Sequence, residues 1–332
     1  MALLQSKWLR MFAWILLMVT SFVFVITGTF FDSKLLWLSL SVICLFNAYL
    51  EYTVSALFIS PGKRKKSIDS KKWNSHYFQH DSITTHMQIN QKSEPAPLVV
   101  FIHGWRGSSA SVFERAEWFV KNGWHAVIFE LPGHGKSTSL YRWNAITASR
   151  HIQRHLQNLD GILDSERVTD FFFYGHSMGG YISTRLSSKK GNIPNGMSLT
   201  GVILESPLLL YSNILNEIVD HLKIPTVLRP LHLRRVFRDV TSMHPDIQID
   251  DGLKQFDVPS WGVPLAPTLV LQSMNDTRLG RDHYDAAVKE FPKSIPFEHH
   301  LIESLSHTGA RTNEEREEIL LNWLNEFDSL QF

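Results

Sequence analysis

The chain has 332 residues, of which 44% are hydrophobic and 20% are charged. This composition suits one large folded domain with additional segments, and it excludes an intrinsically disordered chain. The formal net charge is only +1, so no global basic field indicates nucleic acid as a partner. The 16 histidines and the single cysteine do not fall in any zinc-ligand spacing, and one cysteine can form no intramolecular disulfide.

Two long apolar segments open the chain. Residues 11–31 contain no charged residue, and residues 35–59 are apolar apart from Glu51 and a few small polar residues. A helix needs about 20 such residues to cross the hydrocarbon layer of a membrane. A carboxylate at the centre of a spanning helix costs roughly 2.5–3.5 kcal/mol, and it costs less toward the helix end, where Glu51 lies. We therefore predict a transmembrane helical hairpin over residues 1–60.

The alternatives for the first segment are a cleaved signal peptide and a buried core helix. The segment is too long for the hydrophobic region of a signal peptide, and it is apolar on all sides. Lys7 and Arg10 precede the hairpin, and a run of four basic residues at 63–66 follows it. Positive residues stay on the cytoplasmic side, so both ends of the hairpin and the following domain are expected there, where the basic run could contact lipid headgroups. If the second segment does not cross, that domain lies on the opposite side.

Strand and helix patterns alternate after a basic, polar linker at 61–75. Residues 76–90 predict a leading pair of strands, and residues 98–102 form an apolar run typical of buried parallel strands. Further strands are predicted at 125–129, 171–174, 201–205, 268–272 and 296–302, and helices at 109–120, 146–163, 179–188 and 281–291. Thr312 and Glu315 have the spacing of a capping box that opens a terminal helix. The alternation predicts an α/β fold with a doubly wound, mostly parallel sheet over residues 76–332.

The interval at about 208–264 breaks this alternation. Residues 208–224 have amphipathic helical spacing, and residues 228–236 mix leucines with arginines. We interpret the interval as a helical cap inserted over the end of the sheet. Four of its basic side chains could bind a phosphate headgroup or could form a solvated helix face: Arg229, His232, Arg234 and Arg235.

The sequence Gly-His-Ser-Met-Gly at 175–179 has the Gly-x-Ser-x-Gly spacing of a nucleophile elbow. It follows a predicted strand and precedes a predicted helix, as the sharp turn of an elbow requires. Small flanking residues avoid a clash in that turn, and the helix N-terminus favours developing negative charge. This context predicts that Ser177 is a nucleophile.

An oxyanion hole needs two backbone N–H groups. The N–H of Met178 follows the nucleophile directly, and that of Trp105 lies in the His-Gly-Trp loop after the strand at 98–102. The alternative for this His-Gly pair is a simple turn. A glycine-rich loop at 131–137 lacks the spacing of a phosphate-binding loop, and we expect it to shape the rim of the site.

The elbow, the His-Gly loop and the Pro-Gly-His-Gly-x-Ser loop, in this order, resemble the α/β-hydrolase superfamily. Within it the chain is similar to the monoacylglycerol lipase, lysophospholipase and serine aminopeptidase-like group, from about residue 75 to its C-terminus. Glu130 departs slightly from the pattern, since an Asp often precedes the glycine-rich loop in that group.

The resemblance implies a triad in the chain order Ser, acid, His. His307 follows the last predicted strand, where the family places its base, whereas the competing His299 and His300 lie within that strand. Asp276 follows the strand at 268–272 and matches the family's acid, although Ser273 replaces the usual glycine. Asp282 is the rival, but it lies in a predicted helix.

These residues predict a serine hydrolase that needs no metal and no organic cofactor. The leading hypothesis is a carboxylic ester hydrolase for lipid-like substrates, with membrane lipids as partners and no nucleic acid. An aminopeptidase or amidase of the same fold is the alternative, and a non-catalytic membrane scaffold is a third reading. The sequence does not identify protein partners.

Overall fold

The computed structural model describes residues 7–61, 65–80, 82–140, 142–194 and 196–329. Residues 63 and 64 of the basic run lie outside this range. The chain forms two compact units. One unit comprises Met1–Ile59 and Asn213–Gly252, and the other comprises Ser60–Ser212 and Leu253–Phe332.

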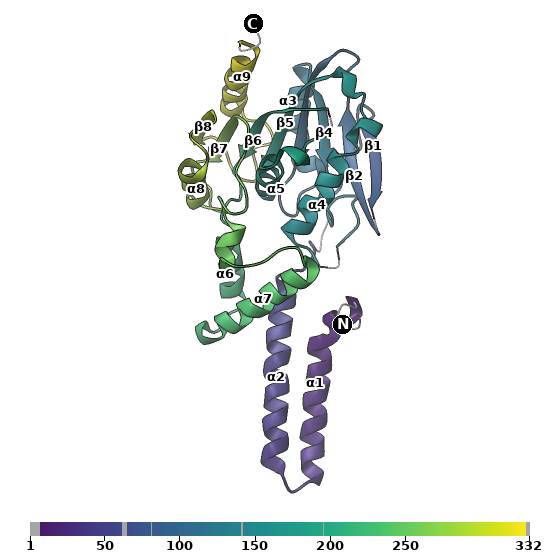
Figure 1. Ribbon diagram of the computed structural model, residues 1–332, viewed down its shortest axis with the longest axis vertical. Coiled ribbons are helices and arrows are strands. Elements are labelled where there is room, and N and C mark those ends of the chain that lie inside the picture. Colours follow the sequence, from purple (N-terminus) through teal and green to yellow (C-terminus); the bar gives the residue numbers. More distant parts are fainter. Residues whose placement is uncertain (1–6, 62–64, 81, 141, 195, 330–332) are drawn as a thin grey trace. The chain divides into compact units, whose positions relative to one another are not determined.

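The first unit contains two long apolar helices joined by a short turn (Figure 1), α1 (Lys7–Phe30) and α2 (Lys34–Ala56). Both are long and apolar enough to cross a membrane, by length and composition. Small residues let them approach closely, since the Ser21 and Ser41 hydroxyls hydrogen-bond at 2.7 Å and Gly28 faces Trp37. Many of their large apolar side chains are exposed, and Phe22, Phe30 and Leu35 are among the most exposed.

The first unit also holds most of the inserted interval. The interval forms α6 (Tyr211–His221), the short helix η6 (Thr226–Leu228) and α7 (Arg229–Met243). The prediction of helices here is confirmed. Pro230 near the start of α7 suits the first helical turn, where a proline costs no hydrogen bond.

The second unit is built on one eight-stranded sheet in the order β1-β2-β4-β3-β5-β6-β7-β8, with β1 and β8 at its edges (Figure 1). Its strands are β1 (Asn74–His80), β2 (Ile83–Asn90), β3 (Ala96–Ile102), β4 (His125–Phe129), β5 (Val168–His176), β6 (Leu199–Glu205), β7 (Thr268–Ser273) and β8 (Phe297–Ile302). Only the pairings of β2 with β1 and with β4 are antiparallel. The predicted mostly parallel sheet and its leading pair of strands are confirmed.

Helices cover both faces of this sheet. They are α3 (Phe113–Lys121), α4 (Ala145–Leu156), α5 (Met178–Ser187), α8 (Asp282–Glu290) and α9 (Glu314–Ser329), with the short helices η2 (Ser109–Ser111), η3 (Leu159–Gly161), η4 (Ser165–Arg167), η5 (Lys190–Asn192) and η7 (Gly252–Phe256). One core combines residues of α3 and α9 with alternate residues of the central strands. On the other face the ring of His155 in α4 stacks on Phe129 of β4.

Two predicted helix boundaries were wrong. The helix predicted at 146–163 ends at Leu156, because Asn158 and Gly161 interrupt the helical run and η3 follows. The capping residue of α9 is Asn313, not Thr312, since the Asn313 side chain accepts a hydrogen bond from the Arg316 backbone N–H at 2.8 Å. An asparagine is among the best N-cap residues, so it displaces the predicted Thr-x-x-Glu box by one position.

Candidate active site

Ser177 lies in the sharp turn between β5 and α5. Its backbone has φ 54° and ψ −117°, a strained conformation for a residue with a side chain. The turn is possible because glycines surround it. A Cβ on Gly175 would lie 2.6 Å from the Gly179 carbonyl oxygen, and one on Gly179 would overlap the Ile102 carbonyl oxygen at 1.8 Å. The elbow predicted from the motif is therefore formed.

Three of the predicted site residues lie in one hydrogen-bonded row. The Ser177 hydroxyl is 3.0 Å from Nε2 of His307, and Nδ1 of His307 is 2.7 Å from Oδ2 of Asp276. Asp276 follows β7 and His307 follows β8, so the carboxyl ends of three parallel strands bring the residues together. Because Nδ1 of His307 donates its proton to Asp276, the lone pair of Nε2 is directed at the Ser177 hydroxyl.

The carboxylate of Asp276 is fixed by four groups. Its Oδ1 accepts hydrogen bonds from the backbone N–H groups of Arg278 and Leu279, and its Oδ2 accepts one from the Gln272 amide in addition to His307. Burial by itself would raise the pKa of Asp276, but hydrogen bonds from His307 and from the two backbone N–H groups outweigh it and hold the pKa at about 2. The carboxylate is therefore ionised at neutral pH.

The rival residues have other partners. The ring of His299 hydrogen-bonds the Tyr284 hydroxyl, and His300 pairs with Glu298. Asp282 lies at the first position of α8. Among the hydrogen bonds of the described residues, none joins His299, His300 or Asp282 to Ser177 or His307.

The loop after β3 approaches the nucleophile. A Cβ on Gly104 would lie 3.0 Å from the Cβ of Ser177, so the backbone directly before Trp105 lies against the serine. The glycine-rich loop after β4 supports this loop. His103 accepts a hydrogen bond from the Leu131 N–H, and His134 accepts one from the Arg106 N–H. Of the two predicted oxyanion donors, Trp105 follows Gly104 in this loop and Met178 is the neighbour of Ser177 in the chain.

Glu130 explains how the glycine-rich loop is built. Its carboxylate accepts hydrogen bonds from the Ser109 and Lys136 backbones and from the side chains of His86 and Ser67. Burial would raise the pKa of Glu130, but hydrogen bonds from the His86 ring and from the backbone outweigh it and hold the pKa at about 2. A Cβ on Gly135 would overlap this carboxylate at 2.0 Å, so the loop needs glycine there.

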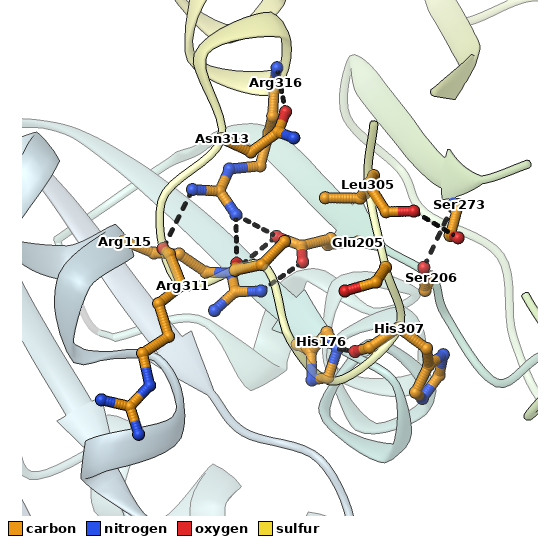
Figure 2. Close-up of polar contacts among 12 residues, drawn as sticks. Arg115, His176, Glu205, Ser206, Ser273, Leu305, His307, Arg311, Asn313 and Arg316 are labelled. Atoms are coloured by element: carbon orange, nitrogen blue, oxygen red, sulfur yellow. Dashed lines mark hydrogen bonds and ion pairs between the residues drawn. The ribbon is translucent and has the colours of Figure 1, made fainter. Parts of the chain in front are cut away.

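A buried ionic cluster that the sequence did not reveal lies beside the site (Figure 2). Arg115 donates two hydrogen bonds to Glu205, which also accepts one from the Tyr174 hydroxyl. The second cation, Arg316, approaches Glu205 at 3.5 Å. Burial would raise the pKa of Glu205, but the charge and hydrogen bonds of Arg115 hold it well below its usual range. No periodicity or spacing links these four residues, which come from separate elements.

Side chains of this region also hold the loop that carries His307 (Figure 2). The ring of His176 donates to the His307 carbonyl oxygen at 2.7 Å, and Arg316 donates to the carbonyl oxygens of Ala310 and Arg311. Burial lowers the pKa of His176 to about 4, so the ring is neutral. Ser273, which stands where the family usually has glycine, donates to the Leu305 carbonyl oxygen at 2.6 Å. The substitution adds a contact to the loop without disturbing Asp276.

Comparison with known proteins agrees with this geometry. A family model described as serine aminopeptidase, S33, matches residues 93–253. An esterase from Pyrococcus furiosus has a TM-score of 0.57 at 16% identity, covering 81% of this chain and 97% of its own. Mouse alpha/beta hydrolase domain-containing protein 10 has a TM-score of 0.54 at 12% identity, covering 78% and 100%. The chain has the α/β-hydrolase fold, and over residues 93–253 it is similar to the serine aminopeptidase-like group.

A curated relative of this hydrolase is the phospholipase YtpA of Bacillus subtilis. The two are 30% identical over 132 residues, which cover 38% of this chain and 46% of the relative. The chain therefore matches less than half the length of that protein. Among the described residues no group of three or more His, Cys, Asp or Glu side chains could hold a metal ion.

Proposed function

We propose that this hydrolase is a membrane-anchored serine hydrolase that cleaves carboxylic esters of lipid-like substrates, such as monoacylglycerols or lysophospholipids. The observation that carries the proposal is the row from Ser177 through His307 to Asp276, with distances of 3.0 and 2.7 Å. A serine is activated when a base lies within hydrogen-bond reach of its hydroxyl and a carboxylate orients that base.

The reaction on this proposal proceeds in two halves. His307 takes the proton of Ser177 while the serine oxygen attacks the acyl carbonyl carbon, and the N–H groups of Trp105 and Met178 stabilise the resulting oxyanion. The intermediate collapses, the C–O bond of the ester breaks, and the leaving alkoxide takes the proton from His307. Water, deprotonated by His307, then attacks the acyl carbonyl carbon of the acyl-enzyme. The ester bond to Ser177 breaks, the serine oxygen takes the proton from His307, and the fatty acid is released. Asp276 holds the Nδ1–H of the imidazole throughout.

Two observations support a lipid-like substrate. The curated relative is named a phospholipase, and the two apolar helices would hold the enzyme at the membrane, where such esters reside. The chemistry of the site would also permit amide cleavage, since the same residues attack both kinds of acyl carbonyl.

Fluorophosphonate labelling of the full-length protein tests the nucleophile. The wild type is expected to be labelled and to hydrolyse acyl esters, and Ser177→Ala is expected to lose labelling and at least about 10³-fold in kcat. Ser183→Ala, which removes a buried hydroxyl of α5 outside the row, is the matched control. An unlabelled wild type would favour the scaffold reading. Preference for aminoacyl amides over acyl esters of matched size would favour the amidase.

The hairpin is proposed to place both of its ends, and the hydrolase unit, in the cytoplasm. The positive residues before and after it support this orientation. When fused after Lys66, a reporter that works only in the cytoplasm is expected to be active. Activity of a reporter that works only on the opposite side would show that the second segment does not cross.

A further inference from the structure

Within the first unit, α7 is attached to α2 by charge. Glu51 of α2 forms ion pairs with Arg235 and with Arg238 of α7, the latter at 3.3 Å. Arg235 also donates a hydrogen bond to the Asn47 side chain, and the His232 ring donates one to the Thr53 backbone. The carboxylate that would be costly in a membrane helix is thus neutralised by two arginines of the inserted interval.

The position of Glu51 along α2 has a direct meaning if the hairpin crosses a membrane. The stretch from Lys34 to Glu51 is about 26 Å long at a rise of 1.5 Å per residue. The hydrocarbon layer is about 30 Å thick. With the polar turn at Asp32 on one side of the layer, Glu51 lies near its opposite boundary. Figure 1 shows α7 running across α2 at that end of the hairpin.

One face of α7, continued into the preceding η6, is exposed. Positions 227, 231, 234 and 238 follow each other at helical spacing, and all four side chains are exposed. Val227 is 83% exposed and Leu231 38%, and the two that follow are Arg234 and Arg238. The opposite face is buried within the chain through His232, Val236, Asp239 and Val240. The exposed face therefore combines apolar side chains with cations.

These observations point to a membrane-contact site. We propose that η6 and α7 lie flat in the headgroup layer of an anionic phospholipid membrane, with Val227 and Leu231 inserted at the acyl boundary and Arg234 against lipid phosphates. An amphipathic helix binds a membrane through buried apolar area and through attraction to anionic lipids. Arg235 and Arg238 are engaged by Glu51, and Arg229 is paired with Asp220. Arg234 has no ion pair among the described residues and is the cation available to a phosphate.

The proposal changes the interpretation of the four basic residues of the interval. Arg229, His232 and Arg235 serve contacts within the unit, and only Arg234 fits the headgroup role. The interval is also joined to the site by its chain, because the Leu208 N–H donates to the Ser177 carbonyl oxygen at 3.1 Å shortly before the chain leaves the hydrolase unit. The inference rests on the proposed insertion of the hairpin.

Depth measurements on the full-length protein in nanodiscs test the insertion of the hairpin and the lipid contact of Val227 separately. In a Cys44→Ser background, single cysteines at Val227, at Phe22 of α1 and at Lys121 of α3 carry a fluorophore. Quenchers attached to lipid and quenchers dissolved in water report its surroundings. Phe22→Cys is the reference for lipid, and Lys121→Cys, an exposed position of the hydrolase unit, is the reference for water. We expect Val227→Cys to be quenched from lipid, at a depth between the two references.

Each outcome has a distinct meaning. Lipid quenching at Phe22 with water-like behaviour at Val227 would overturn this inference and leave the anchor in place. Water-like behaviour at Phe22 would overturn the proposed anchoring and this inference with it. Shielding of Val227 from both quenchers would indicate a protein partner and would also overturn it.

A charge variant tests the role of the arginine. In nanodiscs that contain phosphatidylglycerol, Arg234→Glu is expected to reduce the partition of α7 into the interface by about fivefold or more, since a single cation near an anionic surface contributes about 1 kcal/mol. Lys189→Glu, a charge reversal at an exposed position of the other unit, is the control and should change nothing. In pure phosphatidylcholine the Arg234→Glu effect should shrink. An equal effect in both lipids would contradict the phosphate contact.

Discussion

Replacing Asp276 with asparagine is expected to lower kcat for ester hydrolysis by about 10⁴-fold while the fold is retained. The reason lies in the hydrogen bonds around the side chain. The Arg278 and Leu279 N–H groups donate to Oδ1, so the amide oxygen of an asparagine would occupy that position. Its NH₂ group would then face Nδ1 of His307 and oblige that nitrogen to accept. The proton of the imidazole would move to Nε2, which could no longer take the proton of Ser177.

The measurement is kcat and KM on a soluble acyl ester, with the fluorophosphonate labelling rate as a second readout. Both kcat and the labelling rate should fall while KM changes little. Asp282→Asn, at the start of α8, is the matched control and should leave the rate unchanged. Because the pKa of Asp276 is about 2, its ionisation should not contribute to the pH dependence of the rate above pH 4. An equal loss of kcat in Asp282→Asn would contradict a specific role of Asp276 in the mechanism.

The sheet and the row of three residues could be predicted from the sequence because local signals specify them. Apolar runs bounded by turn residues located the six strands β3 to β8 to within two or three residues at each end. The elbow is a local motif, and Asp276 and His307 follow strands whose carboxyl ends meet at one edge of a parallel sheet. The family resemblance supplied the order of the three residues, and distances of 3.0 and 2.7 Å agree with it.

Contacts between residues distant in sequence could not be predicted in this way. Arg115, Glu205 and Arg316 each lie in a different element, and a lone charge in an apolar strand or a helix has no pattern that names its partner. Glu51 illustrates the same limit. In the sequence it is a cost to a membrane helix, whereas in the fold it is the anion to which Arg235 and Arg238 bind. The start of α9 was missed for a smaller reason, since Thr312 and Asn313 are adjacent candidates for one cap.

Glu205→Gln is expected to destabilise the hydrolase unit by about 3–5 kcal/mol. The carboxylate is the counter-ion of Arg115 and also approaches Arg316, and all three side chains are almost completely buried. Removal of the anion leaves the buried Arg115 guanidinium without its counter-charge, while Arg316 keeps its pair with Glu317, and a stranded buried cation costs far more than the loss of an exposed pair. For a unit of this size the midpoint of thermal unfolding should fall by roughly 6–20 °C.

The matched control is Asp285→Asn, which breaks the exposed pair between Arg281 and Asp285 and should cost at most about 1 kcal/mol. Because the pKa of Glu205 in the folded chain is held below its unfolded value, the stabilisation is complete above about pH 4.3 and is lost as the pH falls toward the folded-state pKa. The gap between wild type and Glu205→Gln should therefore narrow below pH 4. Combining Glu205→Gln with Arg115→Met removes one stranded cation and should recover part of the stability. A double variant as unstable as the sum of the two single variants would show that Glu205 and Arg115 act independently, and the buried ion pair would then not be the source of the effect.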